Sequence, residues 1–182
     1  MKSKNNIKKS RLTYKNGVVA VIFDEENNFL IVQLVSHDKD QWNFIGGVKE
    51  KSDKTNVGNV FRELREKLGI EKEDFRIIEM SKYPFKYDFP ENIVQQEIKQ
   101  GKYFKGEKKD VFVVEFIGNK RNIKIDKDKI KKIKWVKFKD LKKYLVFPNQ
   151  YDHFLKVIQE IIPQTINPNK KSNTDVAKKQ LS

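Results

Sequence analysis

The sequence predicts an α/β (α+β) domain in which a mixed β-sheet is flanked by two helices. Several short runs of β-branched and other apolar residues have the length and composition of buried strands. Two longer segments, one after the Gly46-Gly47 pair and one near the C-terminal end, space apolar residues three and four apart, as amphipathic helices do. A chain of 182 residues is long enough to form one domain with a sizeable core.

The predicted strands follow one another along most of the chain. We expect them at residues 17–23, 29–35, 75–80, 111–116 and 133–138, and the pattern also allows a short one at 122–125. Polar residues at 24–28 predict the turn between the first two strands. Residues 81–109 contain aromatic residues but few regular signals, which predicts a long loop. Loops of this length in compact domains are usually functional.

Two helices and a helical turn complete the predicted fold. The first helix carries one apolar stripe, formed by Val57, Val60, Phe61, Leu64 and Leu68. It ends at Gly69, which can adopt the left-handed conformation that other residues avoid. A closing helix is predicted at 150–162, where Pro163 stops it, and a helical turn at 140–144.

The chain divides into one domain and two polar ends. The domain spans residues 13–162, residues 1–12 form a flexible basic N-terminus, and residues 163–182 form a disordered polar tail. No apolar run approaches the roughly 18 residues of a membrane span. The basic N-terminus has no apolar segment behind it, so it does not resemble a secretory signal. We therefore expect a cytoplasmic protein without a membrane partner.

Composition excludes several kinds of site. The absence of cysteine excludes disulfides, thiolate metal sites and cysteine nucleophiles. Two widely spaced histidines make a histidine-rich metal site a poor interpretation. The net charge of +14 favours polyanionic partners such as RNA or nucleotides. Part of this charge has another explanation, because the abundance of Lys, Asn and Ile together is typical of a compositional bias of the coding genome.

The glycine pair and the helix after it form the candidate site. Glu63 and Glu66 are three residues apart, so they share a face of the helix at the edge of its apolar stripe. Both carboxylates would face the loop at Gly46-Gly47, whose carbonyls no side chain obstructs. Hard cations such as Mg²⁺ take oxygen ligands of this kind and bind phosphates with them. A surface helix with solvated charges is the alternative interpretation of these residues alone.

The same residues resemble the Nudix box, G-x5-E-x7-R-E-U-x-E-E-x-G-U, in which U is aliphatic. Matches to the box are Gly47, Arg62, Glu63, Leu64, Glu66, Gly69 and Ile70. Three departures stand out: Asp53 replaces the first Glu, eight residues rather than seven separate it from Arg62, and Lys67 replaces the second Glu of the E-E pair. The resemblance covers roughly residues 13–162 and implies an αβα sandwich.

Fragments outside the box resemble one branch of this family, the RNA pyrophosphohydrolases and dinucleoside polyphosphate hydrolases. In chain order these fragments are Tyr14-Lys15, Trp42-Asn43-Phe44, Tyr87-x-x-Pro90, residues 104–112 and Phe147. The resemblance implies that a nucleoside polyphosphate or an RNA 5′ end binds at Lys15, Trp42, Tyr87, Lys105, Lys108 and Phe147. Ammonium groups would contact the polyphosphate, and Tyr87 or Phe147 would stack on a base. Core packing is the alternative role of these two aromatics.

The resemblance also implies a metal-assisted hydrolysis of a phosphoanhydride. Glu63, Glu66 and a carbonyl of Gly47 or its neighbour Gly46 would hold Mg²⁺ or Mn²⁺. Arg62 would orient Glu63 through a paired hydrogen bond. A further acid is expected from the loop before the last strand. Asp128 or Asp126 could supply it, with Glu115 as the alternative.

Lys67 leaves three interpretations open, because it places a cation beside the expected metal ligands. In the first, Lys67 turns outward and other acids bind the metal. In the second, its ammonium replaces one metal ion in contacting phosphate. In the third, the domain binds nucleotides, RNA ends or a protein partner without turnover.

Overall fold

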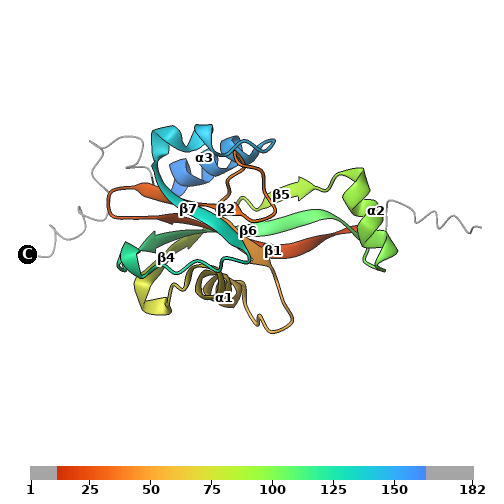
Figure 1. Cartoon of the computed structure of the whole chain (residues 1–182), viewed down its shortest axis with the longest axis horizontal. Coiled ribbons are helices and arrows are strands. Elements are labelled where there is room, and N and C mark those ends of the chain that lie inside the picture. The colour runs from red at the N-terminus through yellow and green to blue at the C-terminus, as the bar shows by residue number, and fades with distance from the viewer. Residues whose placement is uncertain (1–11, 163–182) are drawn as a thin grey trace, which may run out of the picture.

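The computed structural model describes residues 12–162, and its central sheet has helices on both faces (Figure 1). The strands are β1 (Thr13–Phe23), β2 (Asn28–Leu34), β3 (Ile45–Val48), β4 (Phe75–Met80), β5 (Phe85–Asp88), β6 (Phe104–Phe116) and β7 (Ile130–Lys137). The helices are α1 (Asn56–Leu68), α2 (Glu91–Lys99) and α3 (Gln150–Ile161), with short 3₁₀ helices at Lys72–Asp74, Lys120–Asn122 and Phe138–Lys143. The predicted α/β class is confirmed.

The sheet is mixed, as predicted. Its main path runs β4-β6-β1-β2-β7, while β3 pairs with β1 and β5 pairs with β6. The β1–β6 pair is parallel, and the other pairs are antiparallel. Gly46 and Gly47 lie inside β3, opposite Val19 and Val18 of β1, so the glycine pair belongs to the sheet rather than to the loop after it.

Strand β1 is buried on both faces, which explains its continuous apolar run. Val18, Ala20 and Ile22 belong to the core cluster under α1. Val19, Val21 and Phe23 belong to the cluster under α3, because neighbouring side chains of a strand point to opposite faces. The helices supply apolar residues to these two cores: Val60, Leu64 and Leu68 from α1, and Phe154, Val157 and Ile158 from α3. Val57, which was predicted to belong to the stripe of α1, is exposed instead.

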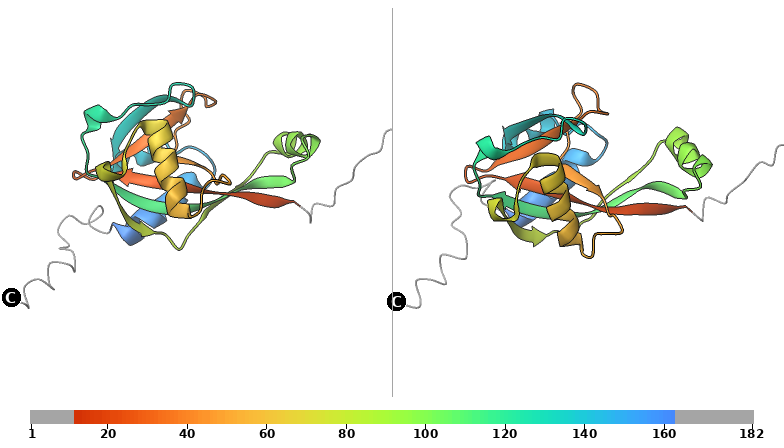
Figure 2. Two further views of the ribbon diagram at one scale, coloured as in Figure 1. Left: turned by 90° about the horizontal axis from the view of Figure 1, so that it is seen from below. Right: turned by 60° about the horizontal axis from the view of Figure 1, so that its bottom comes forward.

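The predicted loop at 81–109 is wrong, because this segment forms β5, α2 and the first part of β6. Together with the start of β1, it projects from the body of the domain as an arm, which we define as residues 13–16 and 86–108 (Figure 2). Backbone pairing rather than apolar alternation defines its strands. Thr13 to Asn16 pair with Phe104 to Lys108, and these short stretches are rich in charged and aromatic residues.

The short strand allowed at 122–125 is also absent. Its backbone instead bonds to the end of α1: Lys124 N–H donates to the Leu68 carbonyl at 2.8 Å, and Asp126 N–H donates to the Lys67 carbonyl at 2.9 Å. Within residues 12–162 no helix is long and apolar enough to cross a membrane. Except for Leu12, the predicted N-terminal segment and polar tail lie outside the described residues.

Candidate active site

The glycine pair brings the sheet backbone directly against α1. A Cβ added to Gly47 would lie 1.9 Å from Glu63 Oε1, so the carboxylate rests on the bare Cα of this residue. A Cβ added to Gly46 would lie 2.3 Å from the Val18 carbonyl of β1. Real Cβ atoms do not approach other atoms this closely, so Gly46, which lies against backbone, requires glycine, and a Cβ on Gly47 would displace the Glu63 carboxylate.

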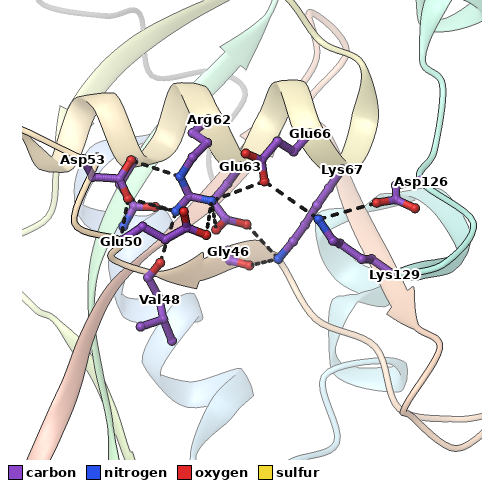
Figure 3. A network of polar contacts seen from close by, with 11 residues as sticks. Gly46, Val48, Glu50, Asp53, Arg62, Glu63, Glu66, Lys67, Asp126 and Lys129 are labelled. Carbon is purple, nitrogen blue, oxygen red and sulfur yellow. Dashed lines mark hydrogen bonds and ion pairs between the residues drawn. The ribbon is translucent and has the colours of Figure 1, made fainter.

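Helix α1 is fixed at both ends. Its N-cap Thr55 accepts a hydrogen bond from Gly58 N–H at 3.0 Å. Gly69, where the helix was predicted to end, has φ 60°, and its N–H donates to the Arg65 carbonyl at 3.0 Å. With Leu64 and Leu68 buried below, the polar residues of the helix face β3 and the loop after it (Figure 3). We call Gly46, Asp53, Arg62, Glu63, Glu66 and Lys67 the box cluster.

Arg62 is the centre of the box cluster. Its Nε donates to Asp53 Oδ1 at 3.0 Å and its Nη2 donates to Asp53 Oδ2 at 2.9 Å, which forms a bidentate pair. Nη2 also donates to the Val48 carbonyl at 3.1 Å and to Asn59 Oδ1 at 3.0 Å. These hydrogen bonds from Arg62 hold the pKa of Asp53 below its ordinary value, and the Asp53 carboxylate raises the pKa of Arg62.

The predicted paired hydrogen bond from Arg62 to Glu63 is therefore wrong, because Nε and Nη2 of Arg62 donate to the two carboxylate oxygens of Asp53 instead. Consecutive residues on a helix do not face each other, whereas Asp53 approaches from the loop. Glu63 keeps one contact, from Arg62 Nη1 to its Oε1 at 3.0 Å. The same nitrogen lies 3.3 Å from Glu66 and 3.4 Å from Glu50, so three carboxylates converge on one guanidinium corner (Figure 3).

Lys67 lies between two of the oxygens expected to bind metal. Its Nζ donates to the Gly46 carbonyl at 2.6 Å and pairs with Glu63 Oε2 at 2.7 Å (Figure 3). Its side chain is only 15% exposed, and that of Glu63 is 6% exposed. The buried Glu63 Oε2 forms this ion pair, but it accepts no hydrogen bond of regular geometry from any group in residues 12–162. Lys67 therefore turns inward, and the first of the three interpretations is wrong.

The residues around Glu63 do not fit a divalent ion at this position. In the described part of the chain, no three His, Cys, Asp or Glu side chains are grouped so that they could hold a metal. A cation bridging Glu63 and Gly46 would need the place that the Lys67 ammonium holds. Gly47, the other predicted carbonyl ligand, points its carbonyl toward β1, where it would lie 2.3 Å from a Cβ on Gly17.

Of the candidate acids near the last strand, Asp126 is the one joined to the box cluster. Its carboxylate lies 3.5 Å from Lys129 Nζ, which in turn lies 3.8 Å from Glu66 (Figure 3). Asp128 is exposed, and only its backbone N–H takes part, donating to Asp126 Oδ1 at 2.9 Å. Glu115 pairs instead with Arg76 of β4, across the β4–β6 edge of the sheet.

Three of the predicted substrate residues lie together on the arm. Lys15 pairs with Glu97 of α2 at 3.0 Å. The Lys105 ammonium lies 4.9 Å from the centre of the Tyr14 ring. The Tyr87 hydroxyl donates to Glu107 at 2.7 Å, and burial together with this carboxylate raises the pKa of Tyr87.

Of the other three predicted substrate residues, Lys108 is at the base of the arm, and Trp42 and Phe147 lie outside it. Lys108 lines a cavity of about 260 Å³ between the base of the arm and the N-terminal end of α1. Trp42 is buried in the core under α3, so its ring is not free to stack on a base. Phe147 is half-buried, with its ring centre 5.3 Å from that of His37. Whether Tyr87 or Phe147 stacks on a base stays a prediction.

Several contacts of this region could not be predicted from the motif. The role of Asp53 as the partner of Arg62 has no spacing signal, because a loop brings the two together. The cavity is lined by Asn16, Gly17, Lys49, Asn56, Lys108 and Asp110, which come from three separate segments. Glu50 had a weak signal, since it lies in the charged loop directly after the glycines.

Comparisons with known proteins identify the family of the chain. Residues 13–157, more than half of the chain, match the model of the NUDIX domain family. An RNA pyrophosphohydrolase of Zymomonas mobilis is 29% identical over 137 residues, which cover 74% of this chain and 86% of that relative. An RNA pyrophosphohydrolase of Pelagibacter ubique is 25% identical over 162 residues, which cover 87% of this chain and 98% of that relative.

Solved structures share the fold at lower identity. The Ap4A hydrolase of C. elegans, in a binary complex, superposes with a TM-score of 0.61 at 14% identity, over 82% of this chain and 98% of that one. The dihydroneopterin triphosphate pyrophosphohydrolase of E. coli gives 0.61 at 16% identity, over 83% and 99%. None of these similarities supports the interpretation of a binding module without turnover. The chain belongs to the NUDIX domain family and is a Nudix hydrolase.

Proposed function

We propose that this hydrolase cleaves a phosphoanhydride in a nucleoside polyphosphate, and that an RNA with a 5′-triphosphate is its substrate. The observation that carries the proposal is the convergence of Glu50, Glu63 and Glu66 on Arg62, directly beside the glycine pair. The names of the two curated relatives support the choice of RNA. The basic residues at the base of the arm supply the charge that a polyphosphate requires.

The cavity between the arm and α1 is the place we propose for the phosphate chain. Lys49 and Lys108 both line it, and both are exposed, so their ammonium groups can reach an anion there. Asn16 and Asn56 add amide groups to the same wall, although Asn56 already donates to Asp110 at 2.6 Å. Lys15 and Lys105 would contact phosphates farther along the arm.

In the proposed reaction a water oxygen attacks phosphorus, and the bond to the bridging oxygen breaks. RNA with a 5′-monophosphate and pyrophosphate leave, and a carboxylate takes the proton of the water. Glu66 is suited to this step, because its side chain is 37% exposed while Glu63 is paired on both oxygens. Arg62 holds these carboxylates in place through contacts with the loop and the helix.

Mg²⁺ or Mn²⁺ belongs to this proposal as the ion that accompanies the polyphosphate. When bound, it would neutralise phosphate charge and lower the pKa of the attacking water. Glu50 is the carboxylate that would remain for it, since its side chain is 61% exposed and Glu66 has the role of base in the proposed step. Glu63 and the carbonyl of Gly46 are already occupied by Lys67.

A substrate panel tests the proposal. We expect release of pyrophosphate from triphosphorylated RNA with Mg²⁺ or Mn²⁺, and slower turnover of diadenosine tetraphosphate. The variant Glu66→Gln, which keeps the shape of the side chain, should lose at least about 100-fold in kcat/KM. Binding of either substrate without any turnover would contradict the proposal. Faster turnover of the dinucleotide would reassign the substrate.

A further inference from the structure

We propose that the Lys67 ammonium is a built-in cation, which takes the place of one divalent ion in the site and contacts a substrate phosphate there. The proposal rests on the proposed function, because it assumes a phosphate substrate. It adopts the second of the three interpretations of Lys67, since the first is wrong and no similarity supports the third. It also makes Lys67 a part of the catalytic site rather than a defect in it.

The position of the ammonium carries the first step. Lys67 Nζ lies 2.6 Å from a backbone carbonyl of β3 and 2.7 Å from a carboxylate one helical turn earlier. These two oxygens, from Gly46 and Glu63, are the pair that a hard cation would bridge. Both ligands are held in place, since Gly46 is paired in the sheet and Glu63 is pressed against the bare Cα of Gly47. The chain therefore presents a preformed cation position, and a side chain of its own fills it.

The charges of the cluster carry the second step. Asp53 and Arg62 balance each other as a pair, and Lys67 balances Glu63. A Glu at position 67 would lower the charge of these four groups by two units, which is the charge of one divalent ion. With Lys67, these four groups have no net charge. With a Glu at position 67, they would need one bound divalent ion to reach the same net charge. An additional ion between Glu63 and Gly46 would be repelled by Lys67 at close range.

The hydrogen-bonding capacity of the ammonium carries the third step. A protonated lysine has three N–H donors and no acceptor. One donor is directed to Gly46 and a second lies against Glu63, which leaves one for another acceptor. The side chain keeps 15% exposure, so the group is not sealed from the site. A phosphate oxygen is the acceptor that the reaction would bring there.

Counting bound metal tests this proposal without measuring turnover. Mn²⁺ titrations followed by electron paramagnetic resonance should show one more bound ion per chain in Lys67→Glu than in the wild type. Lys127→Glu makes the same change of charge at an exposed position in the nearby turn, and its ion count should match the wild type. Equal counts in the wild type and Lys67→Glu would overturn the proposal.

A second variant keeps the test decisive if Lys67→Glu fails to fold. Lys67→Gln retains a donor but loses the charge, and its affinity for inorganic pyrophosphate without metal should fall about tenfold or more. Calorimetry with Lys127→Gln as the control gives the comparison, and an unchanged affinity in Lys67→Gln would overturn the phosphate contact. A chain that turns over no substrate but shows both effects would fail the proposed function while leaving the role of Lys67 intact.

Discussion

The box cluster and the arm both carry many charged side chains, but they hold them in different ways. In the box cluster, Arg62 and Lys67 are mostly buried and bind backbone carbonyls as well as carboxylates. On the arm, Lys15 and Lys105 lie over aromatic rings near the surface, and one of them also pairs with Glu97. The side chain of Lys15 is 21% exposed and that of Lys67 is 15% exposed, so the two regions differ less in burial than in the partners of their charges. Oxygen acceptors fix the direction of the cations in the box cluster, whereas the face of an aromatic ring leaves the N–H donors of Lys105 for a ligand.

The largest expected effect comes from removing the centre of the box cluster. Arg62→Met keeps most of the side-chain volume but leaves Asp53 without its buried cation, while Glu63 keeps only Lys67. Breaking such a pair costs about 3–5 kcal/mol, which should appear as a lower free energy of unfolding in urea titrations. The matched control is Arg76→Met, whose guanidinium is 65% exposed beside Glu115 and should contribute less than about 1 kcal/mol. Similar losses at both positions would contradict the central role of Arg62 in the box cluster.

The second prediction concerns the contact between sheet and helix. Gly47→Ala would place a Cβ 1.9 Å from the Glu63 carboxylate, so the carboxylate must move away. We expect a loss of about 1–3 kcal/mol in unfolding free energy and at least about 100-fold in kcat/KM. Gly58→Ala is the control, since its Cβ would meet only the Thr55 hydroxyl at 3.3 Å. Near-normal kcat/KM in Gly47→Ala would mean that the position of Glu63 is not critical.

The third prediction uses the pH dependence of stability. Hydrogen bonds from Arg62 lower the pKa of Asp53, so its contribution is complete above the ordinary carboxyl value of 3.8 and is lost as the pH falls through the folded value. Asp53→Asn should be about 1–3 kcal/mol less stable than the wild type at pH 7. The difference should shrink in urea titrations below about pH 4. A difference that is constant down to pH 2.5 would contradict the assignment.

The smallest expected effect lies on the arm. Lys15→Gln combined with Lys105→Gln should raise KM for triphosphorylated RNA a few-fold and leave kcat unchanged, because contacts away from the bond that breaks bind the ground state and the transition state equally. The same two substitutions should raise KM for diadenosine tetraphosphate less, since a short substrate does not extend along the arm. Lys139→Gln combined with Lys142→Gln, in the 3₁₀ helix Phe138–Lys143, is the control. A large fall in kcat would place these lysines in the chemistry instead.

The two regions also differ in how far the sequence predicts them. Helix α1 and strand β4 were predictable, because apolar spacing and Gly69 define them locally. The arm was not, since its strands depend on pairing between Thr13 and Phe104, about ninety residues apart. Within the site, the motif identifies Glu63 and Arg62. The motif does not identify the partners of these residues, because only the tertiary fold brings them together. Lys67 contacts Gly46, 21 positions away in sequence, and Asp53 contacts Arg62 from a loop.

Strand β1 runs without interruption from the arm to the glycine pair, so it fixes the distance between them. Lys15 stands three residues before Val18, the register partner of Gly47. At about 3.3 Å per residue, this separation is close to 10 Å along the strand. A polyanion held at both places must match that length. Only an insertion or deletion of an even number of residues would change it without turning Lys15 to the opposite face.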